Sequence, residues 1–262
     1  MDKRMAARIT RYYDDVMYHQ RLFEYFGYSD YFNYGFWTEN TLDQKTACEN
    51  LVEKLLSFLP GKSGTILDVA CGKGETVNYL SKYYELQKIT GINLSAKQLA
   101  TCRQKTPGAN FYQMDAATLE FEDCSFDNII CMEAVFHFHT REKFLKEAHR
   151  VLKPQGYLLL TDLLLTDWGK SHPLWWVDPA NAGLNDLKEY RDLYQQVGFQ
   201  QVEVIDATKE CWEGYYTNLA RFCCDKLEQR ELEESILNKI AVNIFRKIPA
   251  TKNYLLVAAR KE

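Results

Sequence analysis

The sequence predicts an α/β protein in which a parallel sheet is covered by helices on both faces. From Thr65 onwards, short apolar segments of strand length alternate with amphipathic segments of helix length. This alternation is typical of βαβ units, whose strands are parallel and buried. The 262 residues, 46% of them hydrophobic, suit one large α/β domain with an embedded lid better than two independent domains.

Seven segments are predicted to be strands. Each is a short run rich in apolar or β-branched residues, bounded by turn-forming residues. They span residues 65–69, 88–92, 109–113, 126–132, 157–162, 202–206 and 254–260. Helices between them are expected near 74–84, 95–105, 141–152 and 185–197.

Three segments depart from this alternation. Residues 1–60 are expected to form a helical N-terminal cap that is broken near Gly27–Gly35 and ends at Pro60-Gly61. The core then spans 61–262 and carries two lid-like insertions, 163–184 and a long helical stretch at 211–247. We expect both insertions over the carboxyl ends of the strands, where sheets of this kind bind ligands.

Charge and cysteine usage restrict the partners. The net charge is -4 and no Lys/Arg cluster stands out, so no nucleic-acid partner is expected. No run of 18 apolar residues and no signal-peptide core is present, so we expect neither a membrane span nor export. The eight cysteines show neither CxxC nor paired zinc spacing. Reduced thiols, no metal site and a soluble cytoplasmic protein are the expectation.

The stretch ILDVACGKGE, residues 66–75, ends a strand in a glycine-rich turn. A dinucleotide-binding turn has a third glycine for close helix–strand packing, but Val77 stands at that position. Asp68, just upstream, would repel a pyrophosphate and attract an α-ammonium group. The turn therefore favours a cationic, amino-acid-like ligand such as S-adenosylmethionine (SAM) over NAD.

This turn resembles the first motif of class I SAM-dependent methyltransferases. Three later segments resemble further motifs of that family at matching intervals along the chain. They are ITGINLSAKQL (89–99), FYQMDAATLEFEDCSFDNIICMEAVFHF (111–138) and FLKEAHRVLKPQGYLLLTD (144–162). The resemblance implies a doubly wound, seven-stranded, mostly parallel sheet of the Rossmann-like methyltransferase type, with SAM as cofactor.

The resemblance also implies a cofactor site at the strand ends. Gly72 and Gly74 would let the backbone approach the methionine moiety, with Asp68 near its ammonium group. Asn93 would face the ribose in place of the usual Asp or Glu, a departure that loses a charged hydrogen bond. The resemblance also places Asp115 and Ala116 at the adenine and Glu133 at the methionine end, and it adds Ala70, Leu94 and Gln98 to the cofactor-binding residues.

The N-terminal segment resembles the cap of small-molecule methyltransferases that act on sterols, tocopherols, sugars and polyketide or terpenoid natural products. YYD (12–14) and YFNYGFW (31–37) carry this resemblance, which makes Tyr13, Tyr34 and Trp37 candidate lid residues at the cofactor. Twelve of the 26 residues from Tyr12 to Trp37 are aromatic. That density suits an apolar or aromatic substrate, although such rings also attach a cap to its domain. Candidate substrate-binding residues are Trp176, Trp212 and Tyr216.

Two histidines follow the fourth predicted strand in EAVFHFHTR, residues 133–141. His137 could bind metal, hydrogen-bond to the backbone, or act as a general base. Related O-methyltransferases place a histidine here and an aspartate at the end of strand five, which would make His137 the base and Asp162 its orienting partner. His139 is the weaker candidate, because it begins the connection to a helix that Thr140 would cap.

The predicted function is SAM-dependent methyl transfer to a hydroxyl of an apolar or aromatic small molecule, as in secondary metabolism. Transfer to an alkene carbon, as in a prenyl or terpenoid acceptor, would use the same residues and stays open. A SAM-binding protein without activity is the non-enzyme alternative. A nucleic-acid methyltransferase is disfavoured, since the chain lacks an Asn/Asp-Pro-Pro-Tyr/Phe element. We expect a monomer or a homodimer.

Overall fold

The computed structural model describes residues 3–18, 23–172, 177–231 and 233–262. Within these ranges seven strands form one sheet in the order β3-β2-β1-β4-β5-β7-β6. β1 to β5 pair in parallel, and β7 is antiparallel to both β5 and β6. The predicted doubly wound, mostly parallel sheet is confirmed. The strands are β1 Ile66–Val69, β2 Ile89–Asn93, β3 Asn110–Gln113, β4 Phe126–Cys131, β5 Leu152–Leu165, β6 Gln201–Asp206 and β7 Thr251–Arg260.

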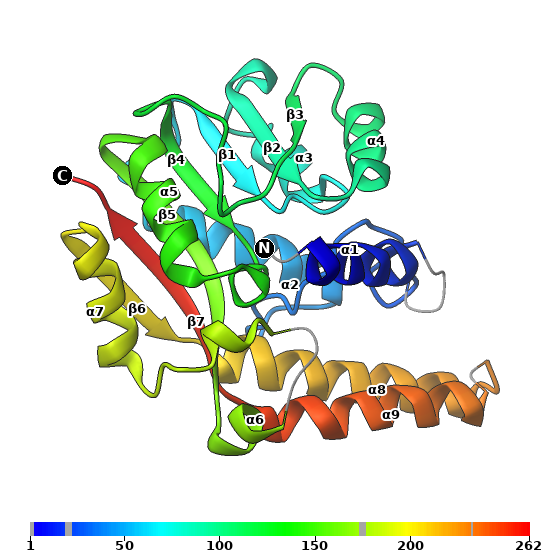
Figure 1. Ribbon diagram of the computed structural model, residues 1–262. Coiled ribbons are helices and arrows are strands. Elements are labelled where there is room, and N and C mark those ends of the chain that lie inside the picture. The colour runs from blue at the N-terminus through cyan, green and yellow to red at the C-terminus, as the bar shows by residue number, and fades with distance from the viewer. Residues whose placement is uncertain (1–2, 19–22, 173–176, 232) are drawn as a thin grey trace.

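Helices cover both faces of this sheet (Figure 1). On one face α2 (Gln44–Leu56), α3 (Glu75–Leu80) and α4 (Ala96–Lys105) contribute to one apolar cluster. On the other face α5 (Arg141–Val151) and α7 (Leu187–Val197) contribute to a second. α2 lies in the sequence segment expected as a cap, yet it packs on β5 and β7 and forms part of the sheet's covering layer.

The segment 211–247 differs from the single long helix that its pattern predicts. A π-helical turn, η5 (Thr208–Glu213), leads into α8 (Gly214–Glu228), and α9 (Glu234–Lys247) then runs back beside it. No glycine or proline marks the break after Glu228. The two helices contact each other and so cover apolar surface that one straight helix would leave exposed.

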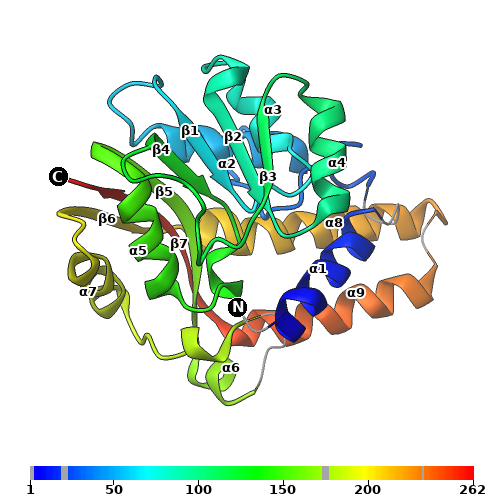
Figure 2. The same cartoon turned by 45° about the horizontal axis from the view of Figure 1, so that its top comes forward.

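The cap also contains less helix than expected. α1 spans Lys3–Met17, and the described residues between it and α2 form turns and extended chain. Gly27 and Gly35 sit there at φ +60 and +75, a conformation that disfavours continuing a helix. Figures 1 and 2 show α1 crossing the edge where β1 and β2 end, with the α8/α9 pair beyond it.

The remaining insertion, 163–184, contains two short helices, α6 (Asp167–Ser171) and η4 (Pro179–Asn181). None of the described helices is both long enough and apolar enough to cross a bilayer. All eight cysteines fall within the described ranges, and each is a free thiol.

Candidate active site

The glycine-rich turn after β1 is held in a left-handed conformation. Ala70, Gly72 and Gly74 have φ of 61, 54 and 82. A Cβ added to Gly74 would lie 3.0 Å from Sγ of Cys102 on α4, so this glycine permits close helix packing. At Gly72 the nearest described atom would be Cε of Met17, at 3.2 Å, on the cap helix. Gly72 therefore presents its backbone to the space beneath the cap.

Asp68 places an unused carboxylate oxygen beside this turn. The residue is 2% exposed, and its Oδ2 has no hydrogen-bond partner among the described residues. Burial raises the pKa of Asp68 well above its usual value. Because a buried oxygen of this kind normally has a partner, its position fits a ligand that brings a positive charge, such as the α-ammonium group of SAM.

The residues predicted at the adenosine lie together at the ends of β2 and β3. Asn93 Nδ2 donates to the Gly72 carbonyl at 3.2 Å and to Gln98 Oε1 at 2.8 Å. Asp115 Oδ1 accepts from the Ala117 backbone N–H at 2.9 Å, and Ala116 is buried. The neighbouring Leu94 is half-buried.

The cap helix α1 reaches this edge through four hydrogen bonds that involve Tyr13, Asp14 and Met17, of which only Tyr13 is a predicted site residue. Tyr13 Oη lies 2.8 Å from His137 Nε2. Asp14 Oδ1 accepts from Ser95 Oγ at 2.6 Å and from Gln98 Nε2 at 2.8 Å. Lys73 Nζ, on the glycine turn, donates to the Met17 carbonyl at 3.2 Å. Asp14 belongs to the YYD segment (12–14), whose resemblance to the methyltransferase cap indicates Tyr13 but could equally have indicated Asp14 as a site residue.

Glu133 connects the end of β4 to the cap and to β7. Its Oε1 accepts from the Tyr34 N–H at 2.7 Å and from the Tyr254 hydroxyl at 2.8 Å. Burial raises the pKa of Glu133 to about 8. Burial also lowers the pKa of Lys247, while Glu133 acts on it in the opposite direction. This half-buried carboxyl is thus poised to take up charge when a cation approaches.

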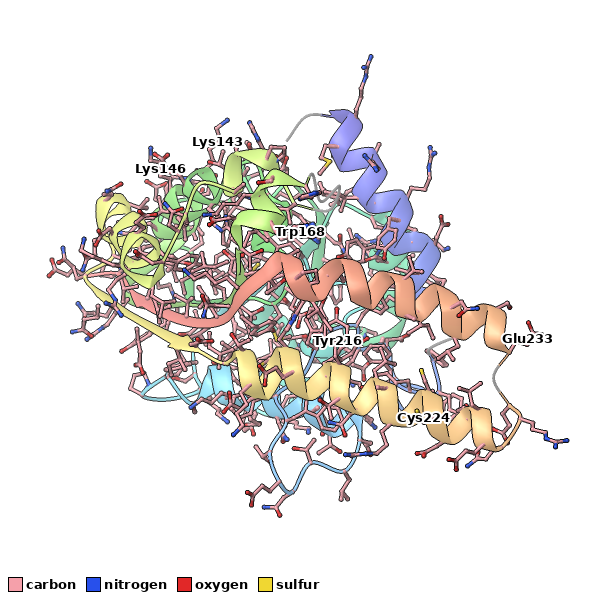
Figure 3. The ribbon with its side chains drawn as sticks, turned by 90° about the horizontal axis from the view of Figure 1, so that it is seen from below. Lys143, Lys146, Trp168, Tyr216, Cys224 and Glu233 are labelled. Carbon is pink, nitrogen blue, oxygen red and sulfur yellow. The ribbon has the colours of Figure 1, made fainter. Side chains whose placement is uncertain are left out.

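An aromatic cluster surrounds Tyr34. Its ring centroid lies 4.8 Å from that of Trp212 and 6.0 Å from that of Tyr216. Figure 3 shows Tyr216 between the ribbons of α8 and α9. Trp212 and Tyr216 are 4% and 9% exposed, so the structure brings these two predicted substrate residues together with the cap.

Trp37, another predicted lid residue, lies next to this cluster, and its Nε1 donates to the Tyr34 carbonyl at 3.2 Å. Trp37 packs against the start of α8, where a Cβ on Gly214 would come within 2.8 Å of Trp37 Cβ. Its backbone N–H donates to the Glu210 carbonyl at 3.0 Å, which fixes it to η5. Trp176 lies outside the described residues.

The predicted pairing of Asp162 with His137 is wrong. Asp162 Oδ2 accepts from Arg141 Nε at 2.5 Å and from the Tyr190 hydroxyl at 2.8 Å, while Oδ1 accepts from the Leu163 N–H at 2.8 Å. Its side chain therefore faces the layer of α5 and α7, and the charge-assisted bonds of a buried guanidinium occupy it.

His137 is the last residue of η3 (Val135–His137), and His139 lies two residues beyond it. His137 is 5% exposed and faces Tyr13 of the cap. His139 Nδ1 lies 3.1 Å from Asp178 Oδ2, and Thr140 caps α5 as predicted, accepting from the Lys143 N–H at 3.3 Å. Across the described ranges, no three His, Cys, Asp or Glu side chains are grouped as metal ligands would be.

The relatives of this chain identify its family. The family described as "Methyltransferase domain" matches residues 67–160, from β1 through the middle of β5. An O-methyltransferase of Pyrenophora dematioidea is 31% identical over 66% of this chain and 69% of its own length. The chain belongs to the class I SAM-dependent methyltransferases.

Other methyltransferases match over different shares of their length. The Phthiotriol/phenolphthiotriol dimycocerosates methyltransferase 1 of Mycobacterium ulcerans (strain Agy99) is 40% identical over 53% of this chain, and the match spans only 51% of that relative. The 27-O-demethylrifamycin SV methyltransferase of Amycolatopsis mediterranei (strain S699) is 25% identical over 87% of this chain and 89% of its own.

A solved structure shares the fold over the full length. Geranyl diphosphate C-methyltransferase of Streptomyces coelicolor A3(2), in complex with Mg²⁺, geranyl diphosphate and S-adenosyl-L-homocysteine, superposes with a TM-score of 0.72 at 15% identity and covers 100% of this chain and 99% of its own. At that identity the likeness concerns the fold alone. Since this chain is a class I methyltransferase, its cofactor is SAM, and the unpartnered oxygen of Asp68 and the open backbone at Gly72 fit the methionine end.

Proposed function

We propose that this methyltransferase transfers a methyl group to a hydroxyl oxygen of an apolar or aromatic small molecule of secondary metabolism. The observation that carries the proposal is the position of His137. Its imidazole is buried at the carboxyl end of β4, and Nε2 lies 2.8 Å from a hydroxyl, that of Tyr13. A hydroxyl can therefore reach this nitrogen beneath the cap.

Such a reaction requires residues that bind SAM and a residue that removes the proton of the acceptor hydroxyl. SAM, when bound, supplies an electrophilic methyl group on a sulfonium. Asp68 and Glu133 would hold its ammonium end through charge. His137 Nε2 would take the proton of the acceptor hydroxyl, since a neutral imidazole has one acceptor nitrogen. For this step the acceptor would take the place of Tyr13 at Nε2, or Tyr13 would pass the proton on.

The aromatic cluster would hold the acceptor and exclude water. Tyr34, Trp212 and Tyr216 come from the cap, η5 and α8, so their faces meet where three parts of the chain converge. Apolar walls favour an apolar acceptor and strengthen the electrostatic interactions of the charged groups next to them. The names of the Pyrenophora and Amycolatopsis relatives, both of which specify oxygen, support hydroxyl as the acceptor group.

Carbon methylation is the second candidate. Aromatic faces stabilise a developing carbocation, and the cluster around Tyr34 supplies such faces. The shared fold of geranyl diphosphate C-methyltransferase is compatible with it. For the setting, we propose a cytoplasmic enzyme that acts as a monomer or homodimer without a nucleic-acid partner.

The test pairs each acceptor with a blocked version of itself. The protein is incubated with methyl-labelled SAM and a panel of hydroxylated apolar and aromatic compounds, and each compound is also supplied as its O-methyl ether. We expect label on oxygen in the free hydroxyl compounds and none in the ethers. Label on carbon in both members of a pair would replace the proposal with carbon methylation. Binding of S-adenosylhomocysteine without any transfer would point to a non-catalytic protein.

A further inference from the structure

We propose that Asp14 of the cap helix supplies the carboxylate that binds the ribose hydroxyls of SAM. The residue at the end of β2 that would carry this charge is Asn93, which is neutral. The structure places Asp14, on α1, next to the end of β2, where it accepts hydrogen bonds from Ser95 and Gln98. α1 would thus contribute a cofactor ligand as well as a cover.

Asn93 has little hydrogen-bonding capacity left for a ligand. Both hydrogens of its Nδ2 are engaged, one by Gln98 Oε1 at 2.8 Å and one by the Gly72 carbonyl at 3.2 Å. Its Oδ1 accepts from the Ser95 N–H at 3.3 Å. A ribose diol offers two O–H donors, and the two oxygens of a carboxylate match them better than one shared amide oxygen.

Asp14 is linked to Asn93 through a single side chain. The Gln98 amide donates from Nε2 to Asp14 Oδ1 at 2.8 Å and accepts at Oε1 from Asn93. Ser95 Oγ also donates to Asp14 Oδ1, at 2.6 Å. Asp14 Oδ2, by contrast, takes no hydrogen bond from any described residue. The charged oxygen that remains available therefore lies one side chain from the expected ribose position.

The surroundings of Asp14 suit a ligand of this kind. Asp14 and Leu94, a residue predicted to bind the cofactor, line the same open groove between α1 and the start of α4. Figure 2 shows α1 passing beside α4, the helix that begins after β2. Because the contacts of Asp14 to Ser95 and Gln98 require α1 to lie against that edge, cofactor binding and cap closure would favour each other.

The competing explanation is that Asp14 only fastens α1 to α4. Asp14→Asn separates the two, because an asparagine oxygen can still accept from Ser95 and Gln98 but carries no charge. The readout is the Kd of S-adenosylhomocysteine by isothermal titration calorimetry, alongside an analogue that lacks both ribose hydroxyls. Asp15→Asn is the matched control, since Asp15 is an exposed carboxylate on the same helix and Ser95 and Gln98 donate to Asp14 instead.

We expect Asp14→Asn to weaken S-adenosylhomocysteine about tenfold and to leave the affinity for the dideoxy analogue unchanged, because a hydrogen bond to a charged acceptor is lost. Asp15→Asn should change neither Kd. Equal losses for both ligands, or no loss for either, would overturn the proposal. Wild-type binding of S-adenosylhomocysteine is the separate check that the cofactor itself is correct.

A carboxylate swap tests the proposal in the other direction. Asn93→Asp added to Asp14→Asn should restore the Kd to within about threefold of wild type, since the charge returns from the strand side. Asn93→Asp alone should improve affinity by less than about threefold, because Asp14 already supplies the charge. A tenfold gain in the single variant, or no recovery in the double variant, would show that Asp14 does not perform this task. The single variant keeps the test decisive even where Asp14→Asn unfolds.

Discussion

The two glycines of the turn after β1 should respond differently to the same substitution. In Gly74→Ala the new Cβ would meet Cys102 at Sγ (3.0 Å), Cβ (3.2 Å) and Cα (3.3 Å), inside the packed contact between the turn and α4. In Gly72→Ala it would meet Cε of Met17 at 3.2 Å, the mobile end of a long side chain. Both residues have positive φ, so both variants force alanine into the left-handed backbone conformation, which lowers the stability of the fold.

The magnitudes follow from these contacts. A left-handed alanine costs about 1–2 kcal/mol, and overpacking a core contact costs about 1–3 kcal/mol more. Gly74→Ala should therefore lower the free energy of unfolding by about 2–5 kcal/mol, and Gly72→Ala by about 1–2 kcal/mol. The affinity for S-adenosylhomocysteine should fall more in Gly72→Ala than in Gly74→Ala, because the added methyl of Gly72→Ala occupies the space where the backbone meets the methionine moiety.

The assay is urea unfolding of each variant without cofactor, together with the Kd of S-adenosylhomocysteine. We expect Gly74→Ala to lose more stability and Gly72→Ala to lose more affinity. Equal losses of stability, or a larger loss of affinity in Gly74→Ala, would refute the assignment of Gly74 to helix packing and of Gly72 to cofactor binding. Gly61→Ala is the control, because an added Cβ at Gly61 has no atom within 4 Å and the residue has no positive φ. This variant should change neither the stability nor the affinity appreciably.

Three other perturbations have defined outcomes. Asp162→Asn leaves the buried Arg141 guanidinium without its charge partner and should lower the free energy of unfolding by about 3–5 kcal/mol; a loss below 1 kcal/mol by urea unfolding would mean that the pair is not buried as described. For Glu133, the pKa of about 8 lies above the ordinary 4.5, so the protonated carboxyl stabilises the fold. The contribution is complete below pH 4.5 and is lost as pH rises towards 8, by up to about 1.4 kcal/mol per pH unit, and Glu133→Gln should remove that slope from the pH dependence of unfolding. An identical slope in both proteins would assign it to another group. Tyr216→Ala should raise the acceptor KM more than the SAM Kd, because its ring lies in the aromatic cluster; equal effects in steady-state kinetics and calorimetry would remove Tyr216 from the acceptor site.

The sheet and the glycine turn could be predicted because their signals are local. Strand periodicity, the positions of Gly72 and Gly74 and the carboxylate of Asp68 are all contained within a few residues of sequence. The motifs that contain these features occur in the order typical of the methyltransferase family, which is why the sequence also indicates the family. The break between α8 and α9 could not be predicted in the same way, since it depends on two helices burying surface against each other and no glycine or proline marks it.

The partners of the polar residues required the tertiary structure. His137 follows β4 and Asp162 lies in the neighbouring strand β5, which is why the sequence pairs them. In the structure the side chain of Asp162 points instead towards Arg141 on α5 and Tyr190 on α7. Asp14 could not be placed at the end of β2 from sequence, because nothing local fixes where α1 lies. Tyr13 was predicted in the lid, and the structure adds its contact with His137.

The most direct test of the account is the single-turnover rate of methyl transfer from bound SAM to a hydroxylated acceptor in His137→Gln. The variant keeps a polar side chain of similar size but cannot act as a base. We expect the rate at pH 7 to fall by about 10²–10⁴, the usual contribution of general base catalysis, with the Kd of S-adenosylhomocysteine unchanged and His139→Gln close to wild type. A His137→Gln enzyme that transfers methyl at the wild-type rate would contradict the proposed role of His137, and with it the central argument for oxygen as the acceptor.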